Sequence, residues 1–209
     1  MYGQPADTPV YSGSSETWPN AVSIASAPDG KCYWVLEAGL SGLGSVQAFG
    51  DAVNYGDETT IAHGSAHVGI PVAMVATRDG KGYWIVDSDG GVFSFGDAVF
   101  HGSMGGRPLN APVAGAAVAP DGNGYWLVAG DGGVFSFGSA LFEGSMANRT
   151  LAEPAVGISV KTTGTGYRLA AADGGVFAFG GAPYLGSMAG HHLSQPVFGI
   201  ASEPDSLSR

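Results

Sequence analysis

The sequence is dominated by one phrase that occurs three times. It reads DGGVFSFGDAVFHGS from Asp89, DGGVFSFGSALFEGS from Asp131 and DGGVFAFGGAPYLGS from Asp173, and these copies begin 42 residues apart. Tyr83 and Tyr125 precede the first two copies at the same interval. A fixed period of this length is typical of repeat architectures, in which each unit buries its apolar surface against its neighbours. The chain is therefore expected to build one body from several similar units.

The repeat divides the whole chain, 1–209, into units of a single domain. An earlier Tyr33-Trp34 marks a first copy that is stretched by insertions, so four full units are expected. They span 21–69, 70–112, 113–154 and 155–196. Residues 1–20 match the end of a unit and residues 197–209 match the start of one. Both ends are therefore expected to contribute to one closing unit.

Each unit is rich in strand signals and lacks helix signals. In the third unit, apolar runs at 113–119, 125–129 and 134–137 are separated by turns that contain Asp-Gly and Asn-Gly, and a short apolar run follows around 141–143. Glycine and asparagine accept the positive φ that tight reversals need. No segment keeps a period of 3.6 over about ten residues. Each unit is predicted to be an antiparallel meander of three or four strands.

These strands carry apolar side chains on both faces, as in YWLV at 125–128. A small sheet with two apolar faces needs cover on both sides, and a ring of such sheets provides it. The first run of each unit is rich in small residues, which suits crowding near a central axis. The sequence predicts an all-β fold, a β-propeller of about 42-residue blades. Five blades are favoured, with the closing blade shared by the terminal strands; four blades, or a β-trefoil, are the alternatives.

Charge and composition exclude several partner classes. The formal net charge is −10, from 8 basic and 18 acidic residues, and no basic cluster is present. This charge repels phosphate backbones, so nucleic acid is not an expected partner. No apolar run approaches the length needed to span a bilayer, and MYGQPADTPV lacks the features of a secretory signal. Cys32 is the single cysteine and has no internal disulfide partner. No cofactor motif or metal-ligand motif is present.

The motif PDGxGYWxVxxDGGVFSFGDAxFxGSMxxxxLxxPV, carried by 77–113 and again by 119–155, resembles tandem repeats of secreted and cell-surface proteins of actinobacteria. The resemblance covers about 20–209. It implies a propeller-like module on exported proteins, located outside the cell or at its surface, that binds envelope components or glycans. No catalytic residue comes with the family. The first unit departs most, because Leu43 stands where the repeated aspartate belongs.

Several repeated side chains are candidates for ligand binding, and each also has a structural explanation. The aspartates before Gly-Gly could ligate a cation or accept sugar hydroxyls, but they could equally cap a turn. The tryptophans could stack on sugars or pack between blades. The arginine that replaces the third tryptophan either reaches to solvent or marks a pocket. These candidates are Asp89, Asp131, Asp173, Trp84, Trp126 and Arg168.

Histidines complete the candidate set. His63 and His67 lie in IAHGSAHVG, within the insertion 53–69 of the first unit, and His101 follows the last apolar run of the second unit. The spacing of His63 and His67 suits a metal ligand pair on a helix, but Gly64 disfavours a helix there. Surface-loop histidines are the simpler interpretation. The repeated serines, such as Ser103 and Ser145, are not expected to be nucleophiles.

Three functions follow from these observations. The leading one is a non-enzymatic module that binds carbohydrate or another cell-envelope ligand at shallow sites between blades or at one rim. A small enzyme or ligand carrier with one pocket at the insertion 53–69 is the second. A structural or oligomer-forming domain is the third. Sites repeated around the ring would favour the first, and one pocket beside His63 and His67 would favour the second.

Overall fold

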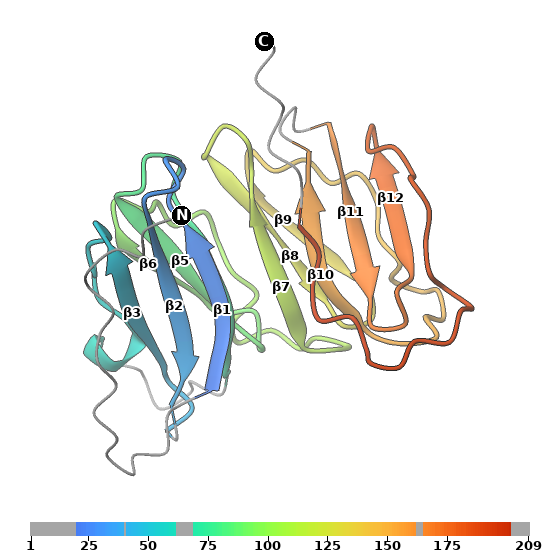
Figure 1. The fold of residues 1–209 in the computed structure, drawn as a ribbon, viewed down its shortest axis with the longest axis horizontal. Coiled ribbons are helices and arrows are strands. Elements are labelled where there is room, and N and C mark those ends of the chain that lie inside the picture. Colours follow the sequence, from blue (N-terminus) through green and yellow to red (C-terminus); the bar gives the residue numbers. More distant parts are fainter. Residues whose placement is uncertain (1–19, 40, 62–68, 162–164, 202–209) are drawn as a thin grey trace, which may run out of the picture.

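The computed structural model describes residues 20–39, 41–61, 69–161 and 165–201. These residues form an all-β structure of twelve strands in four antiparallel three-stranded sheets, plus one 3-10 turn, η1, at Glu58–Thr60 (Figure 1). The first sheet is β1 (Asn20–Ser26), β2 (Cys32–Ala38) and β3 (Gly44–Gly50); the second is β4 (Pro71–Ala76), β5 (Gly82–Asp87) and β6 (Val92–Gly96). The third is β7 (Val113–Val118), β8 (Gly124–Ala129) and β9 (Val134–Gly138); the fourth is β10 (Ala155–Val160), β11 (Gly166–Ala171) and β12 (Val176–Gly180).

Each predicted unit contains one of these sheets, and the strands of a sheet follow one another in sequence order. Tight turns join them where the sequence has Asp-Gly. In the third sheet, Gly122 and Gly132 both have φ of +77°, a conformation that glycine adopts without strain. All four sheets share a break in register within the first strand, for example between Val113 and Gly115. The meander prediction is thus confirmed.

The fourth apolar run of each unit is not a strand among the described residues. The run around 141–143 has no ladder partner and passes from the third sheet to the fourth. Its backbone groups are bonded by side chains instead. Leu141 O accepts a hydrogen bond from the indole of Trp126, and Glu143 N donates one to the hydroxyl of Tyr167. The three-strand version of the unit is therefore the correct one.

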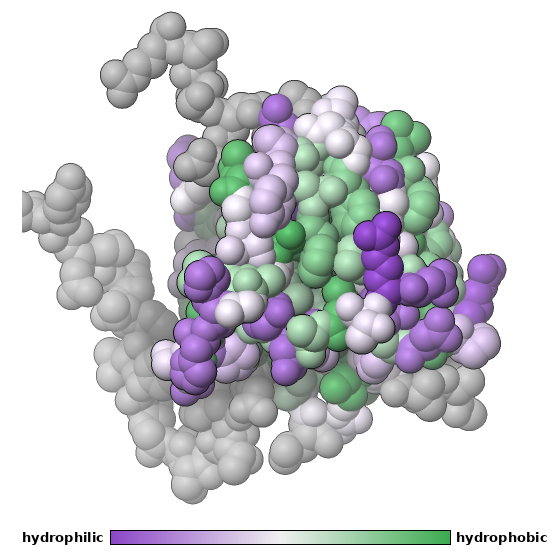
Figure 2. Space-filling model, turned by 90° about the vertical axis from the view of Figure 1, so that its right-hand side faces the viewer, coloured by the Kyte–Doolittle hydropathy of each residue, from purple (hydrophilic) through white to green (hydrophobic). Residues whose placement is uncertain are grey.

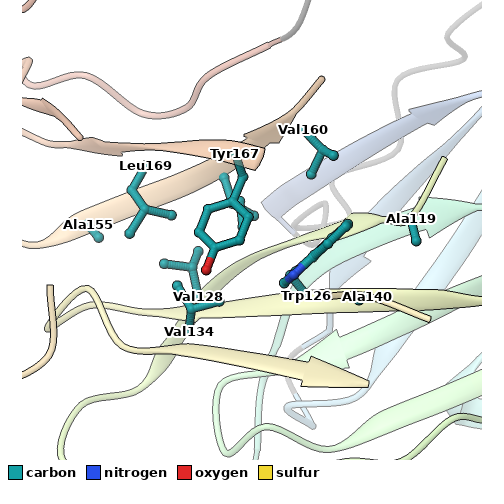
Figure 3. Close-up of a cluster of buried hydrophobic side chains, with 10 residues drawn as sticks. Ala119, Trp126, Val128, Val134, Ala140, Ala155, Val160, Tyr167 and Leu169 are labelled. Carbon is teal, nitrogen blue, oxygen red and sulfur yellow. The ribbon is translucent and has the colours of Figure 1, made fainter. Parts of the chain in front are cut away.

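The first strands of successive sheets adjoin in the order β1, β4, β7, β10, and β1 and β10 stand at the two ends of this series (Figure 1). Three buried clusters each join two neighbouring sheets. In the cluster between the third and fourth sheets, Trp126 and Val128 face Tyr167 and Leu169 (Figure 3). This arrangement is compatible with a propeller-like fold. No helix of the described residues is long and apolar enough to cross a membrane.

Candidate functional site

The repeated tryptophans lie inside the junctions between sheets. Trp84 and Trp126 are 1% and 2% exposed. The indole N–H of Trp84 donates to Val99 O at 2.9 Å, and that of Trp126 donates to Leu141 O at 2.8 Å. Each indole also packs on the tyrosine of the following sheet; the ring centroids of Trp84 and Tyr125 are 5.6 Å apart. The surfaces of both indoles are therefore used in packing between sheets.

Arg168 occupies the tryptophan position of the fourth sheet and reproduces its hydrogen bond. The Nε–H of Arg168 donates to Pro183 O at 2.8 Å, which is the bond that an indole N–H makes in the other sheets. Unlike the tryptophans, Arg168 is partly exposed. A guanidinium at this position keeps the contact to the connecting segment and presents its charge to solvent.

The repeated aspartates cap the turn between the second and third strands. In each copy, Oδ1 accepts a hydrogen bond at 2.8 Å from the backbone N–H two residues further on, at Gly91, Gly133 or Gly175. The remaining oxygen of each carboxylate makes no side-chain hydrogen bond within the described residues. Each aspartate also lines a hollow at the end of the sheets where this turn lies.

These three hollows occupy equivalent positions in the 42-residue repeat. Their volumes are about 280, 270 and 320 Å³ in chain order. Each combines the repeated aspartate with an arginine or histidine side chain, a leucine and the proline that ends the unit. The three sets are Asp89, Arg107, Leu109 and Pro112; Asp131, Arg149, Leu151 and Pro154; and Asp173, His191, Leu193 and Pro196.

In the first two hollows, an acidic and a basic side chain line the same depression. Arg107 and Arg149 are exposed, and neither side chain makes a hydrogen bond or ion pair with another described residue. Leucine and proline supply an apolar patch beside them. Each hollow therefore offers a hydrogen-bond acceptor, a donor and an apolar surface to one small ligand group, which is a combination suited to binding.

A further groove of about 230 Å³ lies between the second and third units. It is lined by Leu109, Asp131 and Phe142, among others, and so it adjoins the hollows on either side of it. The two later hollows share Glu153. These depressions therefore follow one another along one rim, from the second unit to the fourth.

The groove contains an exposed aromatic residue, Phe142, that was not among the candidate ligand-binding residues predicted from the sequence. Phe142 is 59% exposed, and its equivalents Phe100 and Tyr184 are 57% and 62% exposed. The three rings recur every 42 residues in the segments that leave the third strands. The signal in the sequence was an aromatic residue that recurs in the last short apolar run of each unit. The structure leaves these rings exposed because that run pairs with no strand among the described residues. Arg107 and Arg149 were missed as well, because they lie in variable loops.

The histidine candidates are placed in different ways. His101 is half-buried; its ring lies 6.4 Å from that of Trp84 and edge-on to Tyr125 at 5.7 Å. It belongs to the second junction and not to a rim hollow. His63 and His67 lie outside the described residues. Among the described residues, no group of three His, Cys, Asp or Glu side chains could hold a metal ion.

The insertion of the divergent first unit and the second sheet together form a buried pair of acidic groups. Glu58 begins η1, and its Oε2 accepts a hydrogen bond from Gly44 N at 2.6 Å. Asp87, at the end of β5, is fully buried and hydrogen-bonded to Glu58. Burial, this hydrogen bond and the nearby charges of Glu58 and Asp89 raise the pKa of Asp87 to about 9. At neutral pH, Asp87 is therefore protonated.

No protein-family model matches this sequence, and no curated protein matches it either. The rim is therefore the feature of this chain that points to a function. Its repeated depressions bring together Asp89, Asp131 and Asp173 with partners from neighbouring loops, whereas Trp84, Trp126 and His101 belong to the junctions.

Proposed function

We propose that this chain is a non-enzymatic module that binds carbohydrate or a related cell-envelope ligand through the rim. The observation that carries the proposal is the recurrence of one hollow with the same chemistry in three successive units. Each hollow has a carboxylate, an apolar patch and a basic or imidazole side chain. A unique active centre would have no reason to recur in this way.

Sugars fit this combination of groups. Their hydroxyls donate to a carboxylate and accept from a guanidinium, while their C–H faces pack on apolar or aromatic surfaces. Phe142 and Asp131 lie in one groove and offer both kinds of contact. Shallow sites of this size bind weakly one at a time, and several on one rigid body give avidity for a polymer or a surface that repeats the ligand.

The proposed setting follows from the resemblance of the repeats. We infer a propeller whose fifth position begins at Val197 and a location outside the cell or at its surface, on a protein of actinobacterial type. Val197 N donates to Ala172 O at 2.9 Å, as Ala155 N donates to Gly130 O one unit earlier. This equivalence supports a fifth unit position that follows the four described sheets.

A charge-removing series tests the carbohydrate proposal. Asp89→Asn, Asp131→Asn and Asp173→Asn keep the oxygen that caps the turn and remove the charge, so the fold is expected to remain. We expect the wild-type chain to bind defined glycans on an array, each single variant to bind a few-fold more weakly, and the triple variant to lose at least tenfold in apparent affinity.

Asp121→Asn is the matched control. Asp121 caps the corresponding turn at the other end of the third sheet, where its Oδ1 accepts from Asn123 N at 2.9 Å. This variant is expected to bind as the wild type does. A wild-type chain that binds no glycan on a broad array, or a triple variant that binds as well as the wild type, would contradict the proposal.

A ligand carrier or enzyme with one pocket at 53–69 is the second candidate. It is favoured by the buried pair of Glu58 and Asp87, because burial beside Glu58 raises the pKa of Asp87 and strongly perturbed carboxyl groups cluster at functional sites. A ligand whose binding is abolished by Asp87→Asn and unaffected by the triple rim variant would support this candidate over the first.

A further inference from the structure

The three junctions between sheets are built from the same contacts. In each, the tyrosine of the later sheet reaches back to the connecting segment of the earlier unit. Tyr125 Oη donates to Gly102 O at 2.6 Å and accepts from His101 N at 3.2 Å. Tyr167 bonds Gly144 O at 2.5 Å and Glu143 N at 3.1 Å, and Tyr83 bonds Gly56 O at 2.6 Å and Tyr55 N at 3.1 Å.

The third strand of the later sheet adds a second contact at the same glycine. Gly102 and Gly144 have φ of +129° and +130°, and a Cβ on either would lie 2.7 Å from a phenylalanine ring, that of Phe137 or Phe179. A junction therefore requires two strands of the incoming unit, because the tyrosine comes from the second strand and the phenylalanine from the third.

The outer end of the fourth unit has the receiving half of a junction, and no unit of the described residues docks there. Gly186 has φ of +120°, close to the value at the bonded glycines, yet no atom of the described residues lies within 4 Å of the position of its Cβ. Within the described residues, Leu185 N and Gly186 O have no hydrogen-bond partner. The side chain of Leu185 is 81% exposed. Figure 2 shows apolar surface between hydrophilic residues on this face of the molecule.

Residues 197–201 already occupy the place of the next first strand. A Cβ on Gly157 would lie 3.4 Å from Ile200 and 3.7 Å from Gly199, just as a Cβ on Gly115 would lie 3.2 Å from Gly157. The segment follows the path of a first strand but has no ladder partner in the part of the chain that the structure describes, and Phe198 is 81% exposed. The edge that it presents is open to strand addition.

We propose that this open end is a docking site for a two-stranded hairpin of the same repeat type, supplied by another polypeptide. The hairpin strand that corresponds to β8 pairs with 197–201. Its tyrosine hydroxyl bonds Leu185 N and Gly186 O, and the phenylalanine of the strand that corresponds to β9 packs on Gly186. A complete three-stranded sheet does not fit equally well, because its first strand would meet the segment 197–201. Arg168 then lies against the incoming tyrosine ring, as Trp126 lies against Tyr167.

A peptide that copies residues 121–139 of this chain tests the site directly, since it contains both Tyr125 and Phe137. Fluorescence anisotropy of the labelled peptide, titrated with the full chain, is expected to show saturable binding. Tyr125→Phe or Phe137→Ala in the peptide is expected to weaken binding about tenfold, because each removes one of the two contacts at Gly186.

Variants of the chain locate the binding. Gly186→Ala is expected to weaken peptide binding at least tenfold, because its Cβ would meet the incoming phenylalanine ring, as a Cβ on Gly144 would lie 2.7 Å from Phe179. Gly106→Ala is the matched control, since Gly106 also has a positive φ, of +75°, has no described atom within 4 Å of its Cβ position, and lies in the second unit, away from the open end. It is expected to leave binding unchanged.

Three outcomes would overturn the proposal. They are the absence of saturable binding, equal binding by Gly186→Ala and wild type, and self-association of the chain alone that Gly186→Ala abolishes. The last would assign the end face to a second copy of the chain. Sedimentation velocity of the two proteins separates that result from peptide binding. None of these measurements involves a glycan, so the rim proposal stands or fails independently.

Discussion

Replacing each repeated tyrosine by phenylalanine measures how much the junctions contribute to stability. The change removes one hydroxyl and leaves the ring in place. Tyr83, Tyr125 and Tyr167 are at most 1% exposed, and each hydroxyl makes two hydrogen bonds to the backbone of the preceding unit. Tyr33 has the same position in the first sheet but is 40% exposed, with no hydroxyl bond among the described residues.

The expected loss follows from these contacts. One hydrogen bond contributes about 0.5–1.5 kcal/mol net, so removing two should lower the free energy of unfolding by about 2 kcal/mol at each of the three junctions. In a chain of 209 residues this corresponds to a decrease in Tm of about 4–8 °C. Tyr33→Phe, which loses no such bond, is expected to stay within about 0.5 kcal/mol of the wild type.

Urea unfolding followed by tryptophan fluorescence and by circular dichroism gives the four values. Burial raises the pKa of Tyr83 to about 12, and it raises the pKa of Tyr125 and Tyr167 as well, so the hydroxyls remain protonated at any practical assay pH. If Tyr33→Phe were as destabilising as Tyr125→Phe, or if all three internal variants cost less than about 0.5 kcal/mol, the junctions would not depend on these hydroxyls.

Two further predictions concern single residues. Asp87 has a folded-state pKa of about 9, above its unfolded value of 3.8, so the native state holds a proton that the unfolded state releases. Stability should therefore fall between about pH 4 and pH 9, by up to about 1.4 kcal/mol per pH unit, and Asp87→Asn should flatten this slope in pH-dependent urea unfolding. A wild-type slope of opposite sign would refute the assignment. Gly144→Ala should destabilise by well over 1 kcal/mol more than Gly186→Ala, because both strain the backbone but only the first drives a Cβ into Phe179; equal Tm values would contradict this.

The period of the sequence was sufficient to predict the sheets. Repeated Asp-Gly turns and apolar runs of four to six residues correctly indicated strands such as 125–129. The run at 141–143 was misread as a candidate strand, because apolar composition does not reveal that Trp126 and Tyr167 bond its backbone. Local pattern reports whether a segment is extended, whereas pairing depends on neighbours distant in sequence.

The rim was less accessible to prediction. The aspartates were selected, but their partners were not, because Arg107 and Arg149 lie 18 residues further along in loops of irregular composition. Only the repeat of the fold brings these loops beside the turns. The pair of Glu58 and Asp87 was equally hidden, since an insertion in one unit contacts a strand end where later units have Ala129 and Ala171.

The hydrogen bond from Arg168 to Pro183 has a consequence for how arrays of this kind vary in length. Because the guanidinium donates to the equivalent carbonyl, a single tryptophan-to-arginine change lets a copy tolerate solvent without disturbing the loop that follows. Gain or loss of copies during recombination would then need little accompanying adjustment, and the number of copies could evolve separately from the chemistry each copy displays.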